Sequence, residues 1–157
     1  ISCSLVGSEM CIRDRYKDIH FDICFCSPLI RAKETAQIFL SARNIPIIYD
    51  DRIMEMCFGT YEGIENSFEI PDCPINVLFK DPVNYIPVEN GESFEQLFAR
   101  TGEFLEQAVR PQLEDGKDVL IVGHGAMNSS IVCQIKNEPL ENFWKAGIKN
   151  CKLMKLI

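Results

Sequence analysis

The sequence predicts an α/β fold with three layers, α/β/α, built around a mostly parallel sheet. Two short apolar runs, at residues 21–26 and 119–122, are each followed by a segment whose apolar residues recur at helical spacing. The second run is apolar throughout, which is typical of a strand buried on both faces of a parallel sheet. Because strand and helix patterns alternate and 157 residues suffice for one core, we expect a single domain of this class.

The first part of the chain predicts two strands joined by a helix. Residues 21–26 are rich in β-forming residues, and Pro28 suits the first turn of the helix that follows. Helical spacing of apolar residues then continues to about Arg43. Residues 45–49 predict a short strand at a sheet edge, because Pro46 has no N–H to donate to a neighbouring strand.

The middle of the chain predicts loops followed by a long helix. Residues 50–63 predict a polar loop. Residues 64–91 contain four prolines and predict a long irregular connection, of the kind that forms lids and binding loops. Ser93 is a candidate N-cap for a helix over residues 94–113, which Gly116 and its neighbours end.

The last part of the chain predicts a third strand and more helix. The strand at 119–122 runs directly into Gly123-His124-Gly125. Residues 127–135 then predict a helix, residues 140–144 a shorter one, and residues 151–157 a final strand.

Composition and charge exclude several classes of function. There are 16 Lys and Arg against 23 Asp and Glu, a net charge of -7, so we expect neither nucleic acid nor an anionic membrane as a partner. No apolar run approaches the ~18 residues of a membrane span, and no secretory signal is present. The eight cysteines form no CxxC pair. We therefore expect reduced, mostly buried thiols in a cytoplasmic protein.

The first fifteen residues show neither strand nor helix periodicity. Residues 5–14 resemble, in order, one translated reading frame of a transposase-type sequencing adapter. We therefore interpret residues 1–15 as a non-native segment, with its adapter-like part at residues 4–15, and residues 16–157 as a domain incomplete at its N-terminus. The start at Ile1 agrees with a fragment. An ordinary N-terminal extension is the alternative interpretation.

Three residues are candidates for chemistry: two follow predicted strand ends, where open α/β sheets bind ligands, and the third lies in the predicted polar loop 50–63. Arg31 lies in the first turn after the first strand, where a guanidinium can bind phosphate oxygens. His124, between two glycines, can donate to an anion or exchange protons. Glu55, between two methionines, lies in surroundings that can raise the pKa of a carboxyl and suit it to general acid catalysis. Taken singly, each also fits an ordinary structural or surface residue.

Four blocks of sequence carry a resemblance to a known family. They are Ser27-Pro28-Leu29-x-Arg31-Ala32-x-x-Thr35-Ala36, Glu55-x-x-x-Gly59-x-x-Glu62-Gly63, Gly91-Glu92-Ser93 and Val119-Leu120-Ile121-Val122-Gly123-His124-Gly125. In this order and spacing they resemble the histidine phosphatase superfamily, which includes the cofactor-dependent phosphoglycerate mutases and many broad phosphatases. The resemblance runs from about Phe21 to the C-terminus and implies a phosphoglycerate mutase-like fold.

The resemblance implies phosphoryl transfer through a phosphohistidine, which water or a second substrate then relieves. Arg31 matches the arginine that clamps phosphoryl oxygens, and His124 matches the second histidine of the pocket, which binds the transferring group. Glu55 matches the carboxyl that protonates the leaving oxygen and later activates water. The resemblance implies no metal and no cofactor, and its substrate would be a small phosphorylated metabolite.

One part of the family pattern is missing. The family's nucleophilic histidine stands in an Arg-His-Gly motif at the end of the first strand, and this sequence contains no such motif. His20, the only other histidine, precedes the first predicted strand and is interpreted as a surface residue. The resemblance therefore implies that the first strand is missing or replaced and that this chain lacks phosphatase activity. Because that strand lies inside the family's sheet, we also expect the chain to fold poorly.

Several alternatives stay open. Phosphoglycerate mutases carry a tyrosine three residues after the acid, where this chain has Phe58, so hydrolysis of a phosphomonoester is favoured over mutase-type transfer. A non-catalytic phosphate-binding protein is a further alternative. The chain has no G-x-S-x-G motif for a serine hydrolase, and no cysteine pair with metal-ligand spacing. A second copy of the chain, forming a homodimer, is a candidate partner.

Overall fold

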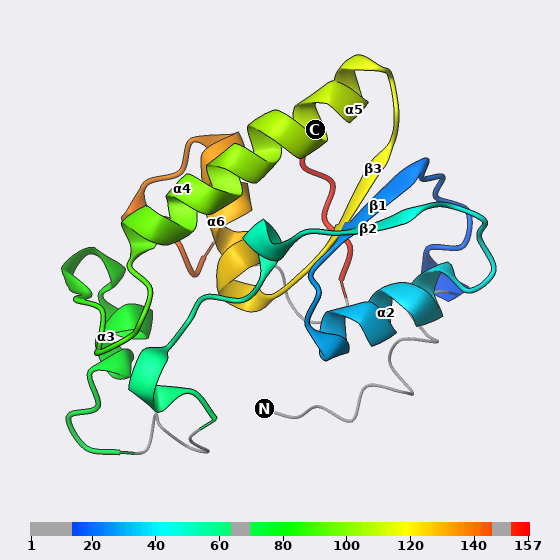
Figure 1. The fold of residues 1–157 in the computed structure, drawn as a ribbon. Helices are drawn as coiled ribbons and strands as arrows, with labels where there is room; N and C mark the ends of the chain where they lie inside the picture. The colour runs from blue at the N-terminus through cyan, green and yellow to red at the C-terminus, as the bar shows by residue number, and fades with distance from the viewer. Residues whose placement is uncertain (1–13, 64–69, 146–151) are drawn as a thin grey trace.

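The computed structural model describes residues 14–63, 70–145 and 152–157. Its strands are β1 (Ile23–Cys26), β2 (Ile47–Tyr49) and β3 (Val119–Val122). Its α-helices are α2 (Ile30–Leu40), α3 (Ile75–Lys80), α4 (Phe94–Phe104), α5 (Arg110–Glu114) and α6 (Gly125–Lys136). Figure 1 shows their arrangement.

The described part of the chain contains one sheet, with the strand order β2-β1-β3 and all strands parallel. Cys26 pairs with Tyr49 on one side and with Val122 on the other, so the carboxyl ends of the strands are level. The parallel sheet confirms the predicted fold class, and β2 lies at an edge as Pro46 indicated. Short parallel strands need helical crossovers, which α2 and the later helices supply.

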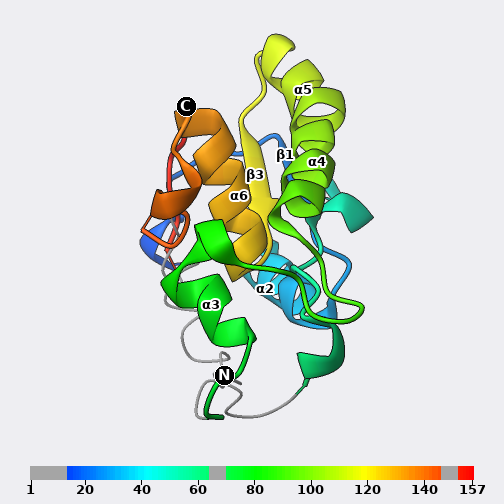
Figure 2. The same cartoon turned by 90° about the vertical axis from the view of Figure 1, so that its left-hand side faces the viewer.

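Helices cover both faces of the sheet and complete the three layers. On one face, Cys24 and Cys26 pack in a buried cluster with the apolar side of α2. On the other face, Ile23 and Phe25 pack with residues of α4 and α6. The Phe25 and Phe104 rings meet edge to face, with centroids 5.4 Å apart. Figure 2 shows α4 and α6 alongside β3.

The predicted long helix forms with an irregularity near its end. Ser93 caps α4 as predicted, and the structure adds a reciprocal capping box with Gln96. After Phe104 the chain makes a turn of π-helix, η5 (Leu105–Val109), before α5. Pro111 follows shortly and lacks the N–H that a regular helix would use, which accounts for the change of hydrogen-bond pattern there.

The connection from 64 to 91 is more ordered than predicted. Residues 64–69 lie outside the described part, but α3 and the 3₁₀ turn η4 (Pro82–Asn84) occupy much of the rest. Pro74 and Pro82 stand at the beginnings of these two elements, where proline is tolerated. They therefore lie on either side of α3 and do not interrupt it. The predicted polar loop 50–63 likewise contains two 3₁₀ turns, η1 (Asp51–Ile53) and η2 (Gly59–Tyr61).

The C-terminal predictions are partly wrong. The helix expected at 140–144 is reduced to the 3₁₀ turn η6 (Leu140–Asn142). The strand expected at 151–157 does not form in residues 152–157, although Leu153 and Leu156 pack against the core clusters. No strand of the described sheet pairs with this segment, and a strand without ladder hydrogen bonds is not stable. No strand precedes β1 in the described part, and residues 1–13 lie outside it, so the missing first strand stays a prediction.

The described cysteines are free thiols, four buried and one, Cys57, exposed. Burial raises the pKa of Cys24 to about 12 and that of Cys26 to about 11, so both are protonated at neutral pH. The prediction of reduced, mostly buried thiols is thus confirmed for these residues, while Cys3, Cys11 and Cys151 lie outside the described part. Among the described helices none has the length and apolar character to cross a membrane.

Candidate active site

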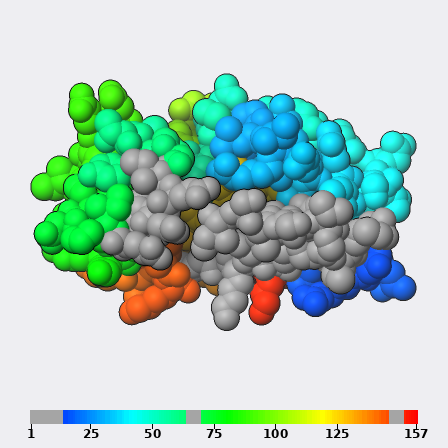
Figure 3. Space-filling model, turned by 90° about the horizontal axis from the view of Figure 1, so that it is seen from below, coloured from blue at the N-terminus to red at the C-terminus, as the bar shows by residue number. Residues whose placement is uncertain are grey.

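The carboxyl ends of β1 and β3 bring the first site residues together. The N–H of Ser27 donates to the Val122 carbonyl at 3.0 Å, so Ser27 and His124 leave the sheet at the same edge. The N–H of Asp50, just after β2, donates to the Cys26 carbonyl at 3.2 Å, so the following loop starts there too. Open α/β sheets bind ligands at this edge. Figure 3 looks onto this side of the molecule, with α2 and the segment around α3 on either side.

Arg31, His124 and Ser27 form a continuous line of hydrogen bonds. Arg31 Nε donates to His124 Nδ1 at 3.1 Å, and His124 Nε2 lies 2.8 Å from Ser27 Oγ. Because Nδ1 accepts a hydrogen bond, it carries no proton, and the proton of the neutral imidazole is on Nε2, which donates to Ser27. Ser27 Oγ also accepts from the Leu29 N–H at 3.3 Å, which leaves its own hydroxyl proton for another acceptor.

The surroundings of His124 keep it neutral. The side chain is buried, with 6% of the residue exposed, and Ser27 is fully buried. Burial, followed by the positive charges of Arg31 and Arg100, lowers the pKa of His124 from 6.5 to about 4. At neutral pH the imidazole is therefore an uncharged donor held between two side chains.

Glu55 binds the N-terminus of α6. It follows η1, and its Oε1 accepts the N–H of Met127 at 3.1 Å and of Met56 at 2.9 Å, while Oε2 accepts the N–H of Ala126 at 3.4 Å. His124 is the N-cap residue of α6, but its side chain makes no capping hydrogen bond. Glu55 supplies the capping acceptor from another loop.

The structure therefore gathers all three predicted residues at one place, the N-terminus of α6. Arg31 contacts His124 directly, and Glu55 bonds to the backbone of the first turn that His124 caps. The helix begins at Gly125, two residues earlier than predicted, which is what makes His124 its cap. The chemical roles of these residues stay a prediction.

Two further residues belong to the site and were not identified from the sequence. Ser27 lies in the first motif block, and its position at the end of a buried strand was the signal that could have found it. Arg100 lies on α4, and its charge lowers the pKa of His124. Nothing in the spacing of α4 distinguishes Arg100 from a solvated helix residue, so only the fold reveals its place.

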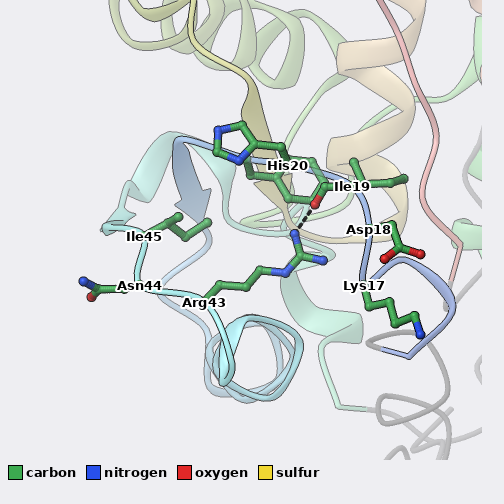
Figure 4. Close-up of a pocket in the computed structure, with 8 residues that line it drawn as sticks. Lys17, Asp18, Ile19, His20, Arg43, Asn44 and Ile45 are labelled. Atoms are coloured by element: carbon green, nitrogen blue, oxygen red, sulfur yellow. Dashed lines mark hydrogen bonds between the residues drawn. The ribbon is translucent and has the colours of Figure 1, made fainter.

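His20 precedes β1, so it lies at the amino ends of the strands, opposite the candidate site. It is exposed, as predicted. Its Nε2 lies 2.9 Å from Asp22 Oδ1. An open depression beside it is lined by residues 17–21 and 43–45 (Figure 4). The Arg43 guanidinium there already donates to the backbone carbonyls of Ile19 and Tyr16. The depression contains none of the candidate residues, so we place the site at the carboxyl edge of the sheet.

The family of the protein follows from comparison with known proteins. The family model of the histidine phosphatase superfamily (branch 1) matches residues 10–157, and the chain belongs to this superfamily. It is 33% identical over 111 residues to a 2,3-bisphosphoglycerate-dependent phosphoglycerate mutase of Cytophaga hutchinsonii. The aligned region covers 68% of this chain and 51% of that protein. The chain is 26% identical over 136 residues to the adenosylcobalamin/alpha-ribazole phosphatase of Escherichia coli, covering 80% and 62%.

Solved structures agree with this assignment. The fold matches YhfR of Bacillus stearothermophilus with a TM-score of 0.77 and 28% identity, covering 87% of this chain and 67% of that one. It matches the alpha-ribazole phosphatase of Shigella flexneri with a TM-score of 0.73 and 25% identity, covering 92% and 71%. The chain spans roughly half to two thirds of the length of the curated relatives named above. The phosphoglycerate mutase-like fold is thereby confirmed.

Proposed function

We propose that the pocket at the N-terminus of α6 binds the phosphoryl group of a small phosphorylated metabolite, and that the protein's chemistry is phosphomonoester hydrolysis. The line from Arg31 through His124 to Ser27 carries this proposal. Arg31 uses Nε for the histidine, and within the described residues its two terminal nitrogens make no hydrogen bond, so we propose them for phosphoryl oxygens. The Ser27 hydroxyl proton is a further donor at the same sheet edge, because Ser27 Oγ only accepts from His124 and Leu29.

A phosphoryl dianion would change the protonation of His124. Burial and two arginines lower the pKa of the imidazole, and a dianion beside it offsets the arginine charges. The pKa of His124 therefore rises on binding, and when it crosses the solution pH the imidazole takes up a proton at Nδ1. This breaks the hydrogen bond from Arg31 Nε to Nδ1 and frees that N–H for a phosphoryl oxygen. The cationic form would stabilise the charge that develops on the transferring phosphoryl group.

Glu55 is proposed as the general acid and base. Its carboxyl would protonate the leaving oxygen of the substrate and later take a proton from the attacking water. The three backbone N–H groups that bind this carboxylate hold it in place. A fixed acid saves the entropy that would otherwise be lost in orienting it.

The phosphohistidine step needs a nucleophilic histidine that we do not assign in this chain. The chain has two histidines. His20 is exposed at the far edge of the sheet, and both ring nitrogens of His124 are hydrogen-bonded. We propose that the chain of 157 residues binds phosphoryl groups without turnover, and that hydrolysis through a phosphohistidine is the chemistry of a form that contains Arg-His-Gly.

Hydrolysis is proposed over mutase-type transfer because of Phe58. The Phe58 ring packs against the apolar cluster that contains Met56 and Tyr85, and it has no hydroxyl to bind a second phosphorylated acid. The free buried thiols also fit the reducing conditions of the cytoplasm, which we propose as the compartment.

Calorimetry with phenyl phosphate on the full chain tests the proposal, and p-nitrophenyl phosphate tests turnover. We expect saturable binding that Arg31→Met weakens at least about tenfold, because a bidentate charged contact is lost. Arg110→Met is the matched control, since among the described side chains Arg110 pairs only with Glu106, in an exposed ion pair. If the unmodified chain does not bind phenyl phosphate, or if Arg31→Met and Arg110→Met bind it equally well, the proposed phosphoryl-binding site is wrong. Turnover that His124→Ala abolishes overturns the claim that this chain is inactive.

A further inference from the structure

Arg100 uses all three of its guanidinium nitrogens, two on Glu92 and one on the loop that carries Glu55. Nε and Nη2 donate to the two carboxylate oxygens of Glu92 at 2.6 and 2.9 Å, a two-pronged ion pair. Nη1 donates to the carbonyls of Arg52 at 2.6 Å and of Met54 at 2.9 Å. The side chains are 21% exposed for Arg100 and 12% for Glu92, so the pair is largely shielded from water.

Glu92 extends the same network to the other side of Glu55. Its Oε2 accepts the N–H of Cys57 at 3.3 Å, and its own N–H donates to the Cys57 carbonyl at 2.9 Å. Met54 and Cys57 stand one residue before and two residues after Glu55 in the chain. The backbone that carries the carboxyl is therefore held on both sides by one ion pair.

We propose that Arg100, through Glu92, is a positioning residue that holds Glu55 against the N-terminus of α6. Its importance for catalysis rests on the proposed function, in which Glu55 is the acid and base. A displacement of the loop by ~1 Å would break hydrogen bonds from Ala126 and Met127 to the carboxylate, and displacements of this size can cost ~100-fold in rate.

The geometry requires an arginine. Its planar group serves a carboxylate and two carbonyls at fixed angles, whereas a lysine ammonium offers a single point of attachment. Arg100 also acts on His124 through its charge, so the loop and the imidazole respond to the same residue. Because a residue that merely stabilised α4 would not change the pKa of His124, this effect distinguishes the two roles of Arg100.

Amide hydrogen exchange of Met127, followed by NMR in the full chain, tests the inference without a ligand. The Met127 N–H donates to Glu55 Oε1, so its protection reports where the carboxyl lies. We expect Arg100→Lys and Glu92→Gln each to speed this exchange by about tenfold or more, because a partly buried charged hydrogen bond is lost. We expect Arg100→Met to raise the pKa of His124, while the control Arg110→Met changes neither quantity.

The outcomes separate this inference from the proposed function. If Arg100→Lys and Glu92→Gln fold but leave Met127 exchange as in the control, the positioning role is wrong. If stability falls while the Met127 exchange rate relative to other α6 amides is unchanged, Arg100 is merely structural and the inference is overturned. A chain that fails to bind phenyl phosphate overturns the proposed function only, because the exchange measurement uses no phosphate.

Discussion

Arg31 Nε lies 3.1 Å from His124 Nδ1, in line to donate a hydrogen bond to it. The contact joins the first turn of α2, which follows β1, to the N-cap residue of α6, which follows β3. It selects one tautomer of the imidazole, with the proton on Nε2 facing Ser27. An arginine that contacts a histidine in this way also opposes its protonation, which makes the pH behaviour of the protein a test of the site.

The unfolding free energy should fall as the pH falls from about 6.5 to about 4, because of His124. The folded pKa of about 4 lies below the ordinary 6.5, so within this window the unfolded chain binds a proton that the folded chain does not. The loss should reach at most about 3.5 kcal/mol, at ~1.4 kcal/mol per unit of pKa difference. Urea unfolding at several pH values measures it.

The matched variant for this experiment is His124→Gln, whose amide can still donate and accept hydrogen bonds but does not titrate. The lowered pKa values of Asp22 and Asp50 affect stability at lower pH and in both proteins. If the unfolding free energy of the wild type and of the variant changes equally with pH, the pKa of His124 is not lowered in the folded protein.

Ser27→Ala should destabilise the protein by about 1–3 kcal/mol, because it leaves the buried His124 Nε2–H and the Leu29 N–H without their acceptor. It should also weaken phenyl phosphate binding. Ser41→Ala is the control, since Ser41 is exposed and its hydroxyl donates to the Ile38 carbonyl near the end of α2 and makes no other hydrogen bond in the part of the chain that the structure describes. Equal loss of stability in both variants would contradict the role of Ser27.

Gly59→Ala should be much more harmful than Gly63→Ala. Both glycines have positive φ, 56° and 71°, so both substitutions strain the backbone by about 1 kcal/mol. A Cβ on Gly59 would also lie 2.2 Å from the Glu89 carbonyl oxygen, whereas no atom of the described residues lies within 4 Å of one on Gly63. The difference in melting temperature between the two variants isolates the close approach of the Glu55 loop to residues 89–91, and equal melting temperatures would show that the approach is looser.

The chain should unfold over a broad temperature range and associate through the outer edge of β3. Within the described sheet β3 has one neighbour, and Val119, Ile121 and Val122 are only partly buried. An apolar edge strand with free backbone groups tends to pair with another chain, which is also a route to a homodimer. Calorimetry and sedimentation measure this. A sharp, cooperative transition from a monomer would contradict the expectation.

Periodicity predicted the strands and helices that bury a continuous apolar face. Residues 21–26, 94–113 and 119–122 were recognisable because their side chains alone specify which face is buried. The segment at 151–157 has a strand-like pattern. A strand also needs a neighbouring strand to pair with, and the local sequence does not determine whether one is available. The helix α3 was missed because its flanking prolines resemble those of an irregular loop.

The site was predictable where motif and strand end coincide. Arg31, Glu55 and His124 stand in ordered blocks of sequence, and the fold brings them to the first turn of α6. Arg100 could not be found in this way, because its importance comes from contacts with carbonyls some 46 and 48 positions away in the chain. Such contacts depend on tertiary structure and leave no local pattern.

The pKa of His124 with and without phosphate tests the phosphoryl site most directly. In His20→Asn the chain has a single histidine, so one imidazole C2 proton can be followed by NMR across the pH range. We predict a pKa of about 4 without phosphate and a clear rise with saturating orthophosphate, which Arg31→Met diminishes. A pKa near the ordinary value of 6.5 that does not respond to phosphate would contradict the account.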